Sequence, residues 1–314
     1  MIQLRGKQMP VIDAHVHVWD HFNGCRFGSV KTEPLGFGMV HQGDQEFLML
    51  PPELYEHRVP FGVLERNMIL NGIDKAVILQ NPCYGDQRDY VRDIMESHPG
   101  SITSLGMIDP RNRTEVIRQM DILFHEYHFI GFKIEVPDVP FFLDDPEYDF
   151  LWKKIIDMGA IVAFDLGWND GPFDFNIDRF KNVMIRFPNL RAVLCHLGVS
   201  RLWDVSQQYP FPLLQKTLSL LEINKENLYF DFSGMQCCDP SGEYPYYRCL
   251  DFLKVAKSMG AMNKIMWGSD APMIQRTCTY RQTLTSVVNY CPFLTDDEME
   301  DLLYRTAEKV YFSK

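Results

Sequence analysis

The sequence has no long apolar run and no cluster of basic residues. No stretch approaches the ~20 apolar residues of a membrane-spanning helix, and the first ten residues, MIQLRGKQMP, lack the apolar core of a signal peptide. Asp and Glu number 42 against 31 Lys and Arg, so the net charge is −11, whereas nucleic-acid binding requires clustered cations. We therefore expect a cytoplasmic protein with a small-molecule substrate and with neither a membrane nor a nucleic-acid partner.

The eight cysteines lack the spacing of a metal or redox motif. No Cys-x-x-Cys occurs, and the cysteines are scattered apart from the adjacent Cys237 and Cys238, which predicts reduced and mostly buried thiols. The chain of 314 residues is 46% hydrophobic and 23% charged, as is usual for globular proteins. It is long enough for one large α/β barrel, and we expect a single domain over residues 1–314.

Eight apolar runs of strand length alternate with segments of helical spacing. The runs cover residues 11–20, 74–82, 102–110, 129–137, 160–168, 190–198, 227–235 and 264–272. Continuous apolar character, rich in Val and Ile, is typical of parallel strands that helices cover. Eight such alternations predict the α/β class and a (β/α)8 TIM barrel.

Two segments depart from a bare barrel. Residues 20–59, rich in Gly, Pro and aromatic residues, form a long insertion after the first strand, and a helix is expected from near Pro60. A long loop after a barrel strand lies on the catalytic face, so we interpret it as a lid; it could equally be the interface of a homo-oligomer. The tail from Thr295 begins as a capped helix would, and we expect it on the outside of the barrel.

Polar residues gather where the predicted strands end, the position of catalytic groups in such barrels. They are His15, His17, Asn81, Asp109, Lys133, Glu135, Asp165, His196, Asp231, Ser233 and Asp270. His15 and His17 are two apart, so on a strand their side chains share a face and can bind one cation. The alternatives are a pair of core histidines bonded to neighbours and, for Asp270, a helix cap.

Three motifs carry a family resemblance over nearly the whole chain. DAHVHVWD, CHLG and WGSDAP, in this barrel order, resemble the amidohydrolase-related branch of the amidohydrolase superfamily, which contains lactone hydrolases and nonoxidative decarboxylases. The resemblance implies a metal-dependent hydrolase in which His15 and His17 bind metal. His196 matches the strand-six histidine, and Asp270 matches the aspartate that ligates metal or takes a proton.

One position departs from the family pattern. Where many members place a metal-binding histidine after strand five, this chain reads AFDLG and has Asp165. Either His15, His17, Asp165 and Asp270 together hold one divalent ion, zinc or alternatively manganese, or Asp165 bonds elsewhere and the metal is weak or absent. An aspartate here is similar to the lactonase side of the branch.

Further polar residues predict a site for an anionic substrate. Lys133 and Glu135 share a face of strand four; Lys133 either meets a substrate carboxylate, pairs with Glu135 or Asp165, or, as in binuclear members, is carboxylated and bridges two metals. Cations and polar groups suited to an anion follow strands two and eight. These are Asn81, Tyr84, Arg88 and Arg276.

The expected reaction is the opening of a small sugar-acid or carboxylated lactone. Asp270 would take the proton of the attacking water, and His196 would stabilise the developing oxyanion. The alternatives are decarboxylation of an unsaturated or aromatic acid on the same residues, and a barrel that binds a ligand without chemistry.

Overall fold

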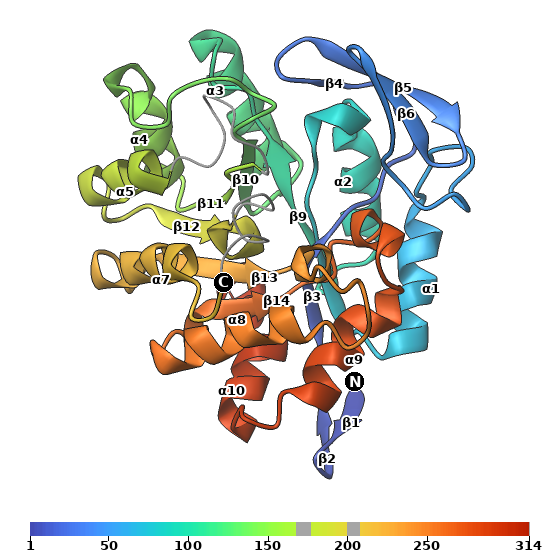
Figure 1. Cartoon of the computed structure of the whole chain (residues 1–314). Coiled ribbons are helices and arrows are strands. Elements are labelled where there is room, and N and C mark those ends of the chain that lie inside the picture. Colours follow the sequence, from blue (N-terminus) through green and yellow to red (C-terminus); the bar gives the residue numbers. More distant parts are fainter. Residues whose placement is uncertain (168–176, 200–207, 314) are drawn as a thin grey trace.

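All eight predicted strands are present and form one parallel barrel sheet. The computed structural model describes residues 1–167, 177–199 and 208–313. The barrel strands are β3 (Ile12–Val16), β8 (Lys75–Ile78), β9 (Ile102–Met107), β10 (Gly131–Glu135), β11 (Ile161–Asp165), β12 (Arg191–Leu194), β13 (Leu228–Phe232) and β14 (Ile265–Trp267). Each pairs with the next one along the chain (Figure 1), which confirms the (β/α)8 prediction.

The first and last strands close the barrel through a short contact. Val16 and Ala271 form a single parallel bridge. The amide of Asp270 donates to the carbonyl of His15, and the amide of His17 donates to the carbonyl of Ala271, both at 2.8 Å. We call Asp13–His17 and Gly268–Ala271 the closing junction.

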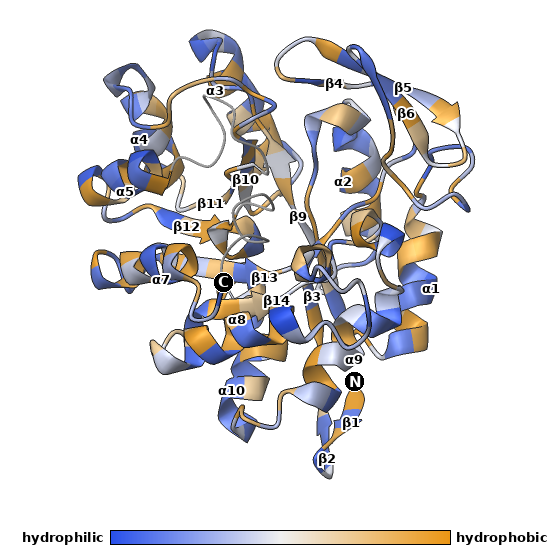
Figure 2. Ribbon diagram, viewed as in Figure 1, coloured by the Kyte–Doolittle hydropathy of each residue, from blue (hydrophilic) through white to orange (hydrophobic). Residues whose placement is uncertain are grey.

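Helices surround the sheet and cover its outer face. They are α1 (Phe61–Asn71), α2 (Arg88–Ser97), α3 (Arg113–Asp121), α4 (Asp149–Asp157), α5 (Ile177–Arg186), α7 (Pro212–Leu218), α8 (Tyr247–Ser258), α9 (Tyr280–Tyr290) and α10 (Asp296–Glu300). Their hydrophilic and hydrophobic residues alternate along each helix (Figure 2). Covered on the outside and packed within, strands such as β3 and β11 are buried at every residue, which explains their largely apolar sequences.

The insertion after β3 contains a small antiparallel sheet that the sequence analysis did not predict. Its strands are β4 (Cys25–Arg26), β5 (Val30–Gly36), β6 (Met39–Gln42) and β7 (Gln45–Leu48). The segment packs on the barrel mouth where the amides of Asn23 and Gly24 donate to the carbonyls of Tyr84 and Cys83. A Cβ on Gly24 would lie 1.8 Å from the carbonyl oxygen of Pro82, so this close approach requires glycine. As predicted, a helix, α1, begins just after Pro60.

The C-terminal tail packs on the barrel from outside and closes its amino-terminal end. Thr295 caps α10 with a capping box, as expected. Beyond that helix, Val310 and Tyr311 pack among residues that fill the barrel interior, such as Ala14 and Val193. The tail also pairs with a strand start, because Glu308 lies 2.7 Å from the ammonium of Lys75.

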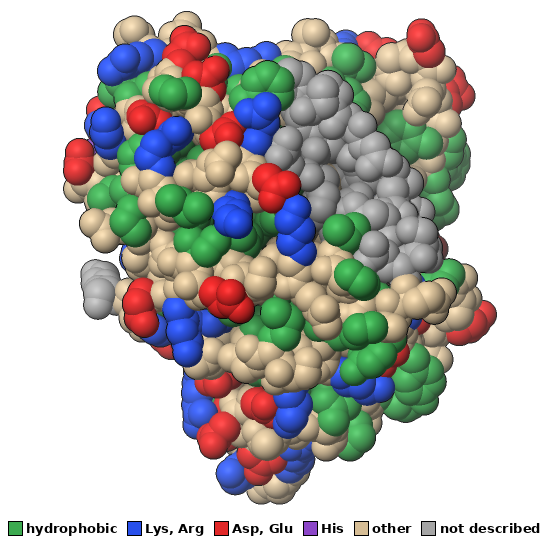
Figure 3. Space-filling view, turned by 60° about the vertical axis from the view of Figure 1, so that its left-hand side comes forward, with side chains coloured by type: hydrophobic (Ala, Val, Ile, Leu, Met, Phe, Trp, Pro, Cys, Tyr) green, Lys and Arg blue, Asp and Glu red, His purple; other side chains and the backbone are tan. Residues whose placement is uncertain are grey.

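The described surface mixes charges of both signs. On the face shown in Figure 3, Lys and Arg side chains alternate with Asp and Glu. Within the described ranges, no helix has the length and apolar character needed to cross a membrane.

Candidate metal centre and active site

The closing junction brings His15, His17 and Asp270 together. His15 lies on β3, His17 directly follows that strand, and Asp270 follows β14 in a left-handed conformation with φ of 60°. The Oδ1 atom of Asp270 lies 3.1 Å from Nε2 of His17 and 3.8 Å from Nε2 of His15. The three predicted residues therefore form one cluster at the carboxyl end of the strands.

Hydrogen bonds to Nδ1 orient all three histidines of the site. Nδ1 of His17 lies 2.8 Å from the carbonyl oxygen of Leu79, and Nδ1 of His196 lies 2.9 Å from that of Ser233. Nδ1 of His15 lies 3.0 Å from the carboxylate of Asp231. Because carbonyl and carboxylate oxygens only accept, each Nδ1 carries a hydrogen. In its neutral form each imidazole would therefore have its lone pair on Nε2, as a metal ligand requires.

His196 and Asp165 form a nearly buried pair on the other side of the cluster. His196 follows β12 in a left-handed turn with φ of 56°, and its Nε2 lies 3.4 Å from Oδ2 of Asp165. Burial alone would lower the pKa of His196, but the hydrogen bond and charge of Asp165 raise it to about 10. Burial opposes ionisation of Asp165 too, yet the hydrogen bond and charge of His196 hold its pKa well below the usual range. Without a metal, this is a cation–anion pair.

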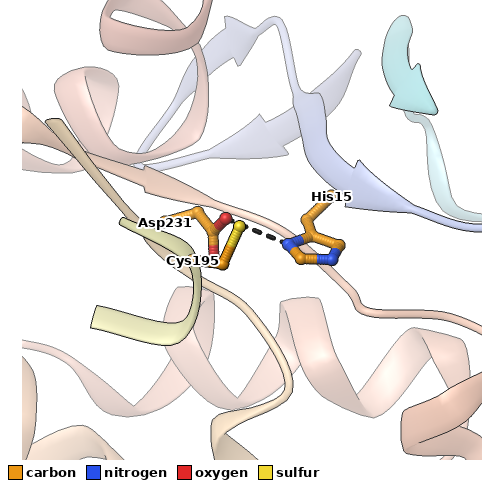
Figure 4. Close-up of side chains that lie close together, drawn as sticks. All are labelled: His15, Cys195 and Asp231. Atoms are coloured by element: carbon orange, nitrogen blue, oxygen red, sulfur yellow. Dashed lines mark hydrogen bonds and ion pairs between the residues drawn. The ribbon is translucent and has the colours of Figure 1, made fainter. Parts of the chain in front are cut away.

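Asp231 and Cys195 complete the inner side of the cluster. Figure 4 shows Asp231 facing one ring nitrogen of His15, with Cys195 beside the carboxylate and the second ring nitrogen pointing away from both. Asp231 also accepts from the amide of His196 at 2.8 Å, so one carboxylate positions two histidines. The strand-end position of Asp231 was predicted, but its role was not; its polar position in the apolar run LYFDF was the available signal.

The residues present fit a divalent cation. Nε2 of His15 is buried and has no hydrogen-bond partner among the described residues. Ligand atoms of His15, His196 and Asp270 lie within 4.8 Å of one another, and so do those of His15, Cys195 and Asp231. The first group suits an ion better, because in the second the hydrogen bond to Asp231 occupies His15 and burial raises the pKa of the Cys195 thiol well above its usual range.

His17 adjoins the first group through Asp270, and burial, the largest cause, lowers its pKa to about 4, so it is neutral at physiological pH. Asp165 belongs to neither group of the described residues; it contacts His196 instead. The expected set of His15, His17, Asp165 and Asp270 is thus brought together only in part, and His196 takes a position that was expected for Asp165.

Lys133 and Glu135 are paired with each other beside the cluster. The ammonium of Lys133 lies 2.8 Å from Oε2 of Glu135, and both side chains are buried. Burial, together with the charge of Asp165, raises the pKa of Glu135 to about 8. Of the three alternatives for Lys133, the structure displays the internal pair.

The other predicted substrate residues are spread around the mouth. Tyr84 is buried, stacks on Trp19 at 4.0 Å and meets the ring of His17 edge-on. Asn81 caps the turn after β8, where its side chain accepts from the amide of Cys83. Arg276 does not reach the cluster, because its exposed guanidinium donates to the carbonyls of Met273 and Leu48. It therefore ties the insertion to the segment after β14.

A separate cavity of about 360 Å³ lies between the insertion and the ends of β8, β9 and β10. Asn81 lines it, as do the charged pairs of Arg88 with Asp86 and of Arg111 with Asp109. None of the clustered histidines lines this cavity.

The sequence matches one protein family over nearly its whole length. The amidohydrolase family model matches residues 12–312, nearly the whole chain. The chain belongs to the amidohydrolase family. No curated protein matches this amidohydrolase.

Solved structures share the fold of this amidohydrolase at low sequence identity. A probable 2-pyrone-4,6-dicarboxylic acid hydrolase from Acinetobacter baumannii, with citric acid bound, has a TM-score of 0.67 at 16% identity over 96% of this chain and 99% of its own. An amidohydrolase from Burkholderia multivorans with bound zinc has a TM-score of 0.69 at 15% identity, with the same coverage of 96% and 99%. A 5-carboxyvanillate decarboxylase from Sphingomonas paucimobilis has a TM-score of 0.57 at 14% identity over 80% and 82%. These likenesses support the barrel fold, and the neighbours include both a hydrolase and a decarboxylase.

Proposed function

We propose that this amidohydrolase opens a small lactone, of the sugar-acid or carboxylated class, by attack of water. The observation that carries the proposal is the convergence of His15, His196 and Asp270, within 4.8 Å of one another at the carboxyl end of the barrel. Buried imidazoles fixed in the Nε2 ligand form and a carboxylate are the donor set of hydrolytic zinc sites. Manganese is the alternative ion, because a carboxylate-rich site is harder.

The metal and the chain's own residues have separate tasks in this proposal. His15, His196 and Asp270, with His17 adjoining, would hold a divalent cation, which would supply Lewis-acid chemistry to polarise the ester carbonyl and acidify water. Asp270 accepts the proton of the attacking water as the oxygen bonds to the acyl carbon. It returns that proton to the alkoxide when the ring C–O bond breaks, so the product is the hydroxy acid.

Positive charge near the reacting carbonyl is present even in the metal-free chain. His196, held as a cation by Asp165 at 3.4 Å, places a positive charge where it can stabilise the oxyanion that forms. The ammonium of Lys133, which now contacts Glu135, is the nearest cation for a substrate carboxylate that competes for it. This supports an anionic substrate.

Decarboxylation remains the second candidate because a solved neighbour carries that activity and the same residues could hold a carboxylate. The two reactions differ in what they release: ring opening yields acid, whereas decarboxylation yields carbon dioxide. The test is elemental analysis of the purified chain, followed by a pH-indicator screen of sugar lactones and pyrone carboxylates with zinc or manganese, and a parallel assay for carbon dioxide.

We expect acid release that a chelator abolishes and the ion restores. Carbon dioxide without acid would replace lactonase by decarboxylase. If the chain binds a ligand but forms neither product and holds no metal, the protein is a barrel that binds a ligand without catalysing a reaction.

We further propose a reducing, cytoplasmic setting, which the buried free thiols of Cys83, Cys195, Cys278 and Cys291 support. The exposed apolar residues of the insertion support self-association; they are Phe27, Leu35, Phe37, Leu48 and Tyr55. Light scattering on a size-exclusion column tests it: a monomeric mass would reject self-association.

A further inference from the structure

Asp13 is a completely buried carboxylate to which the proposed chemistry gives no task. It lies two residues before His15 on β3 and is 0% exposed. Its Oδ1 accepts from the amide of Ser269 at 2.8 Å and from the amide of His15 at 3.2 Å. Its Oδ2 accepts from the hydroxyl of Tyr280, on α9, at 2.7 Å. One side chain therefore bonds β3, the segment after β14 and the helix outside them.

These bonds lie where the barrel sheet is weakest. Between β3 and β14 the ladder is reduced to the single bridge of Val16 and Ala271, whereas neighbouring barrel strands share three or more paired residues. The approach is also unusually close, because a Cβ on Gly268 would lie 2.8 Å from Cβ of His15. A side-chain carboxylate thus replaces ladder hydrogen bonds at this junction.

The same junction holds three residues of the candidate site. Asp270 follows Ser269 directly, and its left-handed backbone and its amide bond to His15 depend on where Ser269 is held. The spacing between the Nε2 atoms of His15 and His17 and the carboxylate of Asp270 is therefore set across the junction that Asp13 bonds.

We propose that Asp13, supported by Tyr280, is a positioning residue that sets the spacing of His15 and Asp270 and thereby the affinity of the site for a divalent cation. The inference rests on the proposed metal centre. Loss of a partner that orients a metal ligand commonly lowers the affinity for the metal about 10- to 100-fold.

The experiment compares Tyr280→Phe, Asp13→Asn and Asp13→Ala with wild type. Tyr246→Phe is the matched control, since it removes a buried tyrosine hydroxyl that donates to the carbonyl of Thr277 instead. Zn²⁺ affinity is measured by competition with a chelating dye, and hydrogen exchange of the peptides covering residues 11–20 and 264–276 is followed in the absence of metal.

We expect Tyr280→Phe to weaken Zn²⁺ binding about tenfold and Asp13→Ala by about 100-fold, with faster exchange in both junction peptides. Asp13→Asn keeps an oxygen for both amides and should recover most of the affinity, and Tyr246→Phe should match wild type. Wild-type affinity and exchange in Tyr280→Phe and Asp13→Ala would overturn the proposal; if Asp13→Ala does not fold, Tyr280→Phe decides alone. A wild-type chain that binds no Zn²⁺ would reject the metal centre, and the exchange of the junction peptides would still decide the role of Asp13.

Discussion

The Oδ2 atom of Asp165 lies 3.4 Å from Nε2 of His196, and both side chains are almost fully buried. This contact places the strand-five aspartate against a histidine and not within the group of ligand atoms formed by His15, His196 and Asp270. The contact has two consequences. In the metal-free protein Asp165 keeps a proton on His196, and a metal that binds His196 must displace that proton.

The first prediction concerns pH in the metal-free protein. The pKa of His196 is raised from 6.5 to about 10, so the folded state binds this proton more tightly than the unfolded chain. Its contribution to the free energy of unfolding is therefore complete below pH 6.5 and is lost as the pH rises to about 10. Asp165, whose pKa is lowered in the folded state, stabilises the folded protein above about pH 3.8. This stabilisation is lost as the pH falls from 3.8 towards the lowered pKa. Urea unfolding with a chelator, between pH 6 and ~10, should show falling stability.

His196→Asn and Asp165→Asn are the controls for this pH dependence. Each should flatten the decline, and the double variant should flatten it no further, because both remove the same pair. Added Zn²⁺ should also weaken the decline in wild type, since the ion takes the place of the proton. An unchanged slope in both single variants would show that other groups cause the decline.

The second prediction tests the proton acceptor. Asp270→Asn keeps the size of the side chain but cannot take a proton, so turnover of the identified lactone should fall at least about 100-fold while the fold survives. Asp109→Asn is the control, because this strand-end carboxylate pairs with Arg111 outside the cluster. Turnover is measured as the acid released over a fixed time. Near-wild-type turnover in Asp270→Asn would reject Asp270 as the base.

The third prediction uses two glycines with the same backbone. Gly234 and Gly260 both have φ of +66°, so alanine costs similar strain at each. At Gly234 the added Cβ would lie 2.6 Å from Oδ2 of Asp270, whereas at Gly260 nothing lies within 4 Å. Both alanine variants should lose about 1 kcal/mol of stability, but only Gly234→Ala should also lose turnover and Zn²⁺ affinity. Equal turnover in the two variants would mean that Asp270 can shift without consequence.

Local patterns predicted the strands of the barrel and indicated where the candidate site lies. Buried parallel strands are apolar throughout, and polar residues at their ends, such as His15 and Asp270, mark the mouth. Each signal lies within about ten residues of sequence, so it can be read without knowing the fold.

The partners of those residues could not be predicted in the same way. Asp231 binds His15 across 216 positions of sequence, and Tyr280 binds Asp13 across 267. Such pairs depend on the register of the closed barrel, which no local pattern contains. The charge of Arg276 suggested an anion site, but its guanidinium donates to the carbonyl of Leu48 on β7 of the insertion, a strand that was missed because it is short and polar.

The last prediction concerns how the insertion is held on the barrel. Arg26 on β4 lies 2.8 Å from Asp138, whose side chain is 0% exposed, while Arg58 at the other end of the insertion pairs with Asp20 at about half exposure. Loss of Arg26 leaves a buried carboxylate without its cation, so Arg26→Met should lower the free energy of unfolding by about 3–5 kcal/mol. Arg58→Met should lower it by less than about 1 kcal/mol, because water screens the exposed pair.

Limited proteolysis within residues 20–59 should follow the same order as these losses of stability. Replacing Asp138 by Leu in the Arg26→Met background should recover most of the loss, since no unpaired charge then remains. Equal losses for the two Met variants would show that the buried pair does not hold the insertion, and that the backbone bonds of Asn23 and Gly24 suffice.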